Sequence, residues 1–205
     1  MIIRQIMACE RDRVKEFYFA FSAEDRRKRF SYTLADATVS KYVDSFDFAR
    51  YTILGAFSAH AELIGLAELA PGTTESELAF SVRPDMRCRR IGTRLMERIL
   101  LHARMTGIGK VFVLFPSENT PMRNLARSAA MQETAEGSDT YASRDLPAPT
   151  AEELSHWPMQ DSVAHASTSA FWQSSVGELL LANPNQQRPN SAILATLPLP
   201  NHVIT

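Results

Sequence analysis

A short basic turn between an apolar strand and an amphipathic helix constrains this chain more than any other stretch. Residues 78–82 predict the strand, and the turn that follows is rich in arginine. The helix is predicted from apolar residues that recur on one of its faces, namely Ile91, Leu95, Ile99, Leu100 and Ala103. The first N–H groups of a helix have no partner within it, and the helix dipole makes that end positive. The stretch therefore predicts a site for an anion such as a phosphate or a pyrophosphate.

Two common phosphate motifs are absent from the sequence. There is no Gly-x-x-x-x-Gly-Lys-Ser/Thr run of a P-loop and no Gly-x-Gly-x-x-Gly fingerprint of a dinucleotide-binding fold. The turn instead resembles the central motif of the GNAT acetyltransferase superfamily, Arg/Gln-x-x-Gly-x-Gly/Ala, which holds the pyrophosphate of acetyl-coenzyme A. Arg87 matches the first position of that motif and Gly92 the last, and Arg90 takes the place of the first glycine.

Other stretches resemble segments of the same family. Residues 119–131 are similar to the segment Asn-x-Pro-Met-x-x-Leu-Ala, with Ala130 and Met131 in place of its closing Gly-Phe. Residues 77–82 and 22–30 resemble segments of the bacterial protein-acetyltransferase branch. The resemblance therefore extends well beyond the basic turn.

The periodicity of residues 1–149 predicts the order strand, helices, three strands, helix, strand, helix and a final hairpin. This is the element order of the GNAT fold, so we expect an α/β domain over residues 1–149, with a mixed, mostly antiparallel sheet flanked by helices.

Residues 150–205 are rich in proline and polar residues and predict a C-terminal extension that is partly disordered or carries a docked helix. Thr150–Leu154 has the pattern of a capping box. Apolar residues of the extension at helical spacing are Trp172, Val176, Leu179 and Leu180.

Several local features of the domain are also predicted. Asp12, Ser22 and Asp36 are expected to cap helices. Residues 26–29, a run of basic side chains, are expected to form a solvated helix face, with an acidic partner as the alternative. Residues 110–115 are expected to form a central strand covered on both faces. A later helix is expected to bury one face, composed of Met122, Leu125, Ala126, Ala129 and Ala130.

The resemblance implies an N-acetyltransferase that uses acetyl-CoA as its co-substrate. The backbone of the strand would meet the acetyl and pantetheine groups, and the amides of the turn would meet the pyrophosphate. The cofactor-binding residues that it implies are Phe80, Ser81, Val82, Arg87, Cys88, Arg89, Arg90, Ile91, Gly92, Thr93 and Asn119.

Glu77 is the candidate catalytic residue. An alkyl amine with a pKa of ~10.4 is almost fully protonated at neutral pH and must lose a proton before it can attack a thioester. Glu77 begins the strand that leads into the basic turn, and it matches the general base of the resembling branch. The alternative is an exposed strand glutamate that pairs with a neighbouring strand. Many family members have a tyrosine general acid where Ala126 stands, so water is expected to protonate the departing thiolate.

Composition argues against several other classes of protein. The formal net charge of -1 gives no general attraction to nucleic acid, and no apolar run is long enough to span a bilayer. The 2 cysteines and 5 scattered histidines show neither a disulfide framework nor metal-ligand spacing. We expect a cytoplasmic monomer or homodimer without metal, nucleic-acid or membrane partners. Its acceptor is expected to be a small-molecule amine or a protein lysine.

The competing hypothesis is a degenerate member of the family that binds acyl-CoA or a partner protein without turnover. Arg90 and Ala126 favour this alternative, because both depart from the usual motif. Glu77 favours the enzyme.

Overall fold

The computed structural model describes residues 1–155. These residues form one mixed, 7-stranded sheet in the order β1-β2-β3-β4-β5-β7-β6, and only the β4–β5 pair is parallel. The predicted α/β class, element order and mostly antiparallel sheet are confirmed. The strands are β1 (Ile2–Gln5), β2 (Thr52–Phe57), β3 (Leu63–Ala70), β4 (Ser76–Val82), β5 (Lys110–Pro116), β6 (Gln132–Glu136) and β7 (Asp139–Asp145). The helices are α1 (Arg11–Phe19), α2 (Ala23–Phe30), α3 (Asp36–Asp44), α4 (Ile91–Met105) and α5 (Thr120–Ser128), with short 3₁₀ turns at Ala8–Glu10 and Pro84–Met86.

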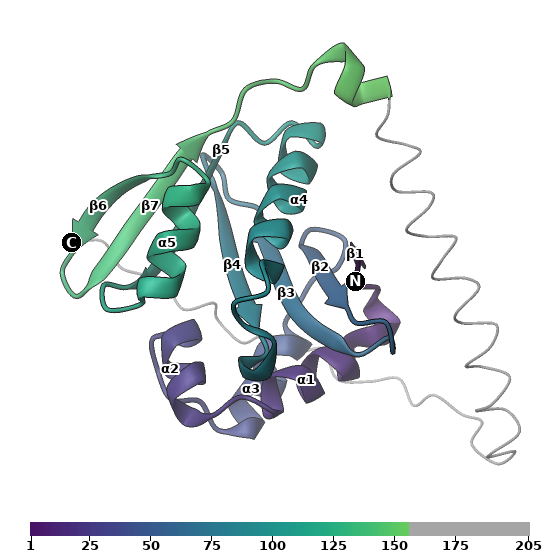
Figure 1. Cartoon of the computed structure of the whole chain (residues 1–205), viewed down its shortest axis with the longest axis vertical. Coiled ribbons are helices and arrows are strands. Elements are labelled where there is room, and N and C mark those ends of the chain that lie inside the picture. The colour runs from purple at the N-terminus through teal and green to yellow at the C-terminus, as the bar shows by residue number, and fades with distance from the viewer. Residues whose placement is uncertain (156–205) are drawn as a thin grey trace, which may run out of the picture. The chain divides into compact units, whose positions relative to one another are not determined.

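Two apolar cores lie on opposite faces of the sheet. Along β2, Leu54 and Ala56 belong to the core shared with α4 and α5, whereas Ile53 belongs to the core shared with α1 and α3. Figure 1 shows α4 and α5 lying in front of the strands, with α1, α2 and α3 grouped below. The predicted inner face of α4 is confirmed, since Leu95 and Ile99 are fully buried there.

Strands β4 and β5 pair over a short distance only. Their register joins Ser76 to Val111 and Glu77 to Phe112, and the pairing recorded between these strands ends there. β4 continues to Val82, and over that length it pairs with β3 on its other side. The two strands therefore diverge from Glu77 onward, and β4 leads along the divergence into the basic turn.

The prediction that residues 110–115 are covered on both faces is wrong. Val111, Val113 and Phe115 are buried in the core with α4, but Phe112 and Leu114 on the opposite face are only partly buried. The core formed with α1 and α3 takes its strand residues from β2 and β3 and does not extend under β5 among the described residues. A continuous apolar run in the sequence therefore marks a strand with one partly open face.

The predicted helix caps are only partly correct. Ser22 caps α2, because its hydroxyl accepts the backbone N–H of Asp25 at 3.1 Å. Asp12 and Asp36 are not caps, since α1 begins at Arg11 and α3 at Asp36 itself. Both carboxylates lie in the first turn instead, where they still suit the positive end of the helix dipole.

The run at residues 26–29 is not a fully solvated face. Arg26 is 8% exposed and donates to the carbonyls of Phe19 and Leu34, and it forms an ion pair with Asp36 at 2.7 Å. The Arg29 side chain is also mostly buried. Positions three apart share a helix face, so these arginines point inward while the residues between them point outward.

The inner face of α5 was predicted correctly except at Ala130. Ala126 and Ala129 are buried, whereas Ala130 is exposed and has a left-handed φ of 53°. Ala130 thus adopts the conformation that glycine usually supplies after a helix. Met131 follows it into the core, as the phenylalanine of a Gly-Phe pair would.

The beginning of the C-terminal extension is tied to the domain. Thr150 and Glu153 form the predicted reciprocal cap of a helical turn over residues 151–155. Arg104 of α4 donates to both carboxylate oxygens of Glu153 at 2.7 Å. The predicted helix around Trp172 to Leu180 lies outside the described residues. None of the helices within residues 1–155 has the length and apolar character needed to cross a membrane.

Candidate active site

The basic turn has an unusual backbone conformation. Cys88 and Arg90 both have left-handed φ values, 60° and 58°, and Arg90 is the N-cap residue of α4. The first helical hydrogen bond runs from the N–H of Arg94 to the carbonyl of Arg90, which leaves the amides of residues 91–93 at the open end of the helix. Arg90 therefore takes up the backbone geometry of a glycine and leaves the start of α4 open, which is the geometry that an anion site needs.

Close packing fixes the position of this helix end. Ile91, the first residue of α4, is 3% exposed. It lies over Gly65 of β3, where an added Cβ would come within 2.9 Å of the Ile91 Cγ2 and 3.1 Å of a Leu95 methyl. A Cβ at position 65 would push against Ile91 and Leu95, so glycine there lets α4 lie this close to β3. The packing of Ile91 on Gly65 thus helps to place the amides at the start of α4.

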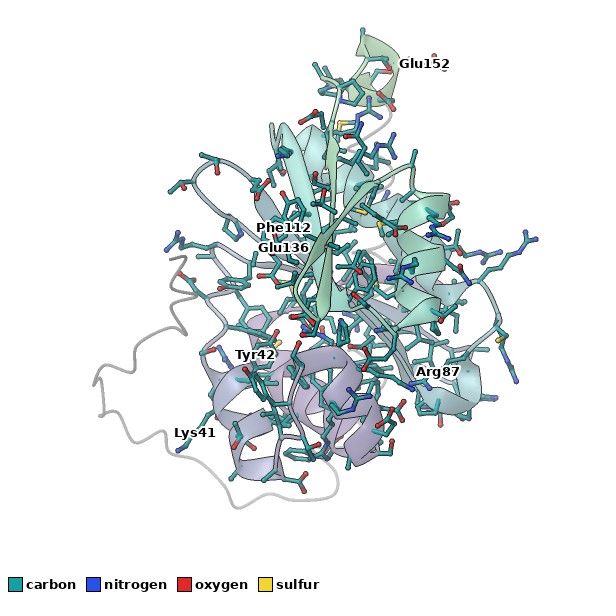
Figure 2. All side chains as sticks on the ribbon, turned by 90° about the vertical axis from the view of Figure 1, so that its left-hand side faces the viewer. Lys41, Tyr42, Arg87, Phe112, Glu136 and Glu152 are labelled. Atoms are coloured by element: carbon teal, nitrogen blue, oxygen red, sulfur yellow. The ribbon has the colours of Figure 1, made fainter. Side chains whose placement is uncertain are left out.

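Ion pairs already engage some of the arginines of the turn. Arg83 binds both oxygens of Asp85 at 2.8 Å, and Arg87 binds Asp25 of α2 at 2.6 Å. Figure 2 shows Arg87 at the turn beside the N-terminal helices. Arg89 and Arg90 are exposed. The turn thus has solvent-accessible positive charge next to the helix N-terminus, as an anion site requires.

The two faces of β4 differ as the sequence predicted. Leu78, Phe80 and Val82 face the core formed with α4. On the other face, the Ser81 hydroxyl donates to the hydroxyl of Tyr18 in α1 at 3.3 Å. Glu77 shares the face of Ser81, is exposed, and lies where β5 begins to diverge. Glu77 is therefore placed at the start of the divergence, within reach of solvent.

A buried polar cluster lies beside Glu77, and the sequence analysis missed it. Glu68 of β3 is 4% exposed and accepts hydrogen bonds from the hydroxyls of Tyr18 and Tyr42 and from Arg29 at 2.8 Å. Its register partner is Ala79, so Glu68 and Glu77 are diagonal neighbours on one face of the sheet. The only signal in the sequence was a single acid within the apolar strand Leu63–Ala70.

Electrostatics keeps the two tyrosines and Arg29 of this cluster protonated. Burial raises the pKa of Tyr42, and the neighbouring Glu68 carboxylate raises it further, so its hydroxyl remains a donor. The same causes raise the pKa of Tyr18. Burial opposes the charge of Arg29, but Glu68 outweighs it and holds the pKa of Arg29 above its ordinary value. Figure 2 shows Tyr42 among the N-terminal helices. The cluster thus ties these helices to the strand next to β4.

An aromatic pair lies on the partly open face of β5. The rings of Phe112 and Tyr141 stack with centroids 5.3 Å apart and planes 23° apart. The Tyr141 hydroxyl donates to Glu75 at 2.7 Å, and Lys110 binds the same carboxylate at 3.0 Å. These hydrogen bonds hold the pKa of Glu75 below its ordinary value. Phe112 is the register partner of Glu77, so an apolar surface adjoins that carboxylate.

The structure gives Asn119 a local role. Its side chain accepts the N–H of Met122 at 3.2 Å as the cap of α5, and donates to the carbonyl of Lys28 at 3.4 Å. Ala126 is fully buried, and because its side chain is a methyl group this position supplies no proton donor. Among the described residues, no group of three or more side chains is arranged to hold a metal ion.

Arg90→Gly should raise the free energy of unfolding by about 0.5–1 kcal/mol, because glycine adopts a left-handed φ without the steric cost borne by other residues. Urea denaturation at neutral pH measures the change. Ala130→Gly, at a similar φ in another part of the fold, is the matched comparison and should stabilise to a similar extent. A loss of stability in both variants would show that neither residue is strained.

Several known acetyltransferases are similar to this chain in sequence or in fold. A family model described as the GNAT acetyltransferase family matches residues 8–130. The GNAT domain of PAT from S. lividans aligns with a TM-score of 0.61 at 24% identity, over 70% of this chain and 89% of that chain. A ribosomal-protein-alanine N-acetyltransferase from Brucella melitensis aligns with a TM-score of 0.57 at 15% identity, over 71% of this chain and 100% of that chain. A phosphinothricin acetyltransferase from Sinorhizobium meliloti, solved with acetyl-CoA, aligns with a TM-score of 0.58 at 15% identity, over 73% of this chain and 93% of that chain. No curated protein matches the chain.

Proposed function

Because the chain belongs to the GNAT family of N-acetyltransferases, we propose that it transfers an acetyl group from acetyl-CoA to a primary amine, with Glu77 as general base. One observation carries this proposal. β4 leads from Glu77, along an edge that diverges from β5, directly to the left-handed turn and the free amides of α4. A carboxylate, a strand edge and an anion site thus follow one another along a single stretch of chain.

The arrangement fits the shape of acetyl-CoA. The amides of Cys88 to Thr93 and the Arg87 guanidinium would hold the pyrophosphate, where the helix dipole and the arginines supply positive charge. The backbone of Phe80 to Val82 would bind the pantetheine and the thioester carbonyl along the diverging edge. Asn119, which caps α5, would act at the site mainly by fixing the start of that helix.

The reaction is a direct attack with one proton transfer before it. Glu77 takes a proton from the ammonium form of the acceptor, directly or through a water molecule. The neutral nitrogen then forms a bond to the thioester carbon, and the C–S bond breaks. Backbone N–H groups of β4 stabilise the oxygen while it carries negative charge. The attacking nitrogen becomes positively charged and gives up a second proton to water, and the departing CoA thiolate takes up a proton from water in turn, since Ala126 has no proton to give.

The acceptor is an amine, either a small molecule or a protein lysine. The partly exposed Phe112 and the Tyr141 stacked on it supply an apolar surface beside Glu77. Such a surface suits an alkyl chain that ends in an ammonium group, because the chain packs on the rings while the charge faces the carboxylate.

A second candidate function is acyl-CoA binding without turnover. Ala126, buried where many members have a tyrosine acid, favours it. Arg90 no longer favours it, because this residue adopts the left-handed conformation that the glycine would have. The two functions differ in whether an amine speeds the release of CoA.

Thermal unfolding with and without acetyl-CoA tests the shared premise of both functions. A ligand at ~100 times its dissociation constant stabilises by about 2.7 kcal/mol, so the midpoint should rise by several degrees. ATP at the same concentration is the control, because it also carries phosphates but lacks pantetheine. No shift with acetyl-CoA, or an equal shift with ATP, would contradict the assignment of the turn.

A further inference from the structure

Helix α2 contacts the basic turn through one ion pair that the proposed reaction does not explain. The Nη2 atom of Arg87 lies 2.6 Å from Oδ1 of Asp25, although the two residues are 62 positions apart in the chain. The Asp25 side chain is 11% exposed and that of Arg87 is 44% exposed. The contact thus joins a fixed, nearly buried acid to an accessible arginine.

Asp25 is held in place from several directions. Its second oxygen accepts the hydroxyl of Ser22 at 2.7 Å, and its backbone N–H donates to the same hydroxyl. Arg26 and Arg29 fix α2 to the rest of the domain. Burial opposes the charge of Asp25, but the hydrogen bonds from Ser22 and Arg87 hold its pKa below its ordinary value. The carboxylate is therefore ionised and immobile at neutral pH.

The ion pair leaves Arg87 able to bind a second anion. Only the Nη2 group of its guanidinium meets Asp25, and a guanidinium has further N–H donors in the same plane. A side chain held at one edge loses less rotational freedom on binding a phosphate than a side chain that is free in solvent. The guanidinium would then lie between the carboxylate and the phosphate and separate their negative charges.

We propose that Asp25 is a positioning residue for cofactor binding, which orients Arg87 toward the open end of α4 before acetyl-CoA arrives. The inference rests on the proposed binding of the pyrophosphate at the turn. It assigns a function to part of the charged segment at residues 22–30, because Asp25 in that segment joins α2 to the turn proposed to bind the cofactor. Asp25 acts through Arg87 and does not touch the reacting atoms.

A double-mutant cycle on the dissociation constant of acetyl-CoA, measured by isothermal titration calorimetry, tests the proposal without an acceptor. Asp25→Asn keeps the size of the side chain and the helix start, and should raise the constant roughly three- to tenfold because a charge-assisted hydrogen bond to Arg87 is weakened. Arg87→Met removes the charge and the N–H donors and should raise it about tenfold or more. In the Arg87→Met background, Asp25→Asn should have no further effect, because the group through which it acts is gone.

Arg27→Gln is the matched control on the same helix. Arg27 pairs with Glu24 and Glu118 at the surface and does not contact the turn, so the dissociation constant should stay unchanged. The proposal is overturned if Asp25→Asn tightens binding, since Asp25 then competes with the phosphate. It is also overturned if Asp25→Asn has no effect, if its effect adds to that of Arg87→Met, or if Arg27→Gln has the same effect. Failure of the unmodified protein to bind acetyl-CoA would instead contradict the proposed function itself.

Discussion

Glu77→Gln should lower kcat by about 10²–10⁴-fold with any amine that supports turnover, and should leave the dissociation constant of acetyl-CoA nearly unchanged. Glutamine keeps the size of the side chain but cannot accept a proton. At neutral pH the acceptor would then remain an ammonium ion, which has no lone pair for attack. The loss should shrink as the pH approaches the pKa of a free alkyl amine, ~10.4, because solvent then removes the proton.

Glu75→Gln is the matched control for this variant. Glu75 lies two positions earlier, at the same end of the strand, but its carboxylate is engaged by Tyr141 and Lys110. We expect a change in kcat of less than about threefold, because no proton transfer is assigned to it. If Glu77→Gln retains activity within the same limit at neutral pH, the general-base assignment is wrong.

Glu68→Gln should lower the free energy of unfolding by about 3–5 kcal/mol, the largest stability effect that we expect for a single polar substitution. The glutamine would leave Arg29 in a mostly buried position without a counter-charge. It would also compete poorly for the hydroxyl protons of Tyr18 and Tyr42, whose donors already point at that carboxylate. Urea denaturation followed by circular dichroism measures the change.

The double variant Glu68→Leu/Arg29→Met separates charge from packing. Removing both ions together should lower the free energy of unfolding less than Glu68→Gln alone, because no uncompensated charge remains in the core. Tyr42→Phe removes one hydrogen-bond donor to Glu68 and should lower the free energy of unfolding by about 1 kcal/mol. A loss below about 1 kcal/mol for Glu68→Gln would mean that water reaches the cluster and solvates Arg29.

The element order, including the basic turn between β4 and α4, was predictable from the sequence because it depends on local pattern. The apolar spacing from Ile91 to Ala103 sets the inner face of α4 wherever the helix packs. The alternation along β4 likewise predicted that Glu77 and Ser81 would share a face. Arg90 and Ala130 stand where the family motifs usually have glycine. Both keep the backbone conformation typical of glycine, with left-handed φ values.

Features that depend on tertiary contacts could not be predicted. A run of basic residues predicts a solvated face, yet Arg29 of α2 binds Glu68, a partner 39 positions away on strand β3. Neither residue signals the other in the sequence. The open face of β5 depends on where the layer of N-terminal helices stops, which strand composition does not record. The limited pairing of β4 with β5 is likewise a property of the sheet.

Stoichiometric transfer of the acetyl group tests the central claim most directly. Radiolabelled acetyl-CoA is incubated with the protein and a panel of amines that includes a lysine peptide, a polyamine and an amino acid, and CoA release and labelled product are both quantified. We predict that at least one amine accelerates CoA release, with one acetylated amine formed for each CoA. If acetyl-CoA binds but no amine accelerates its conversion, the chain is a binding protein and the assignment of Glu77 as a catalytic base is wrong.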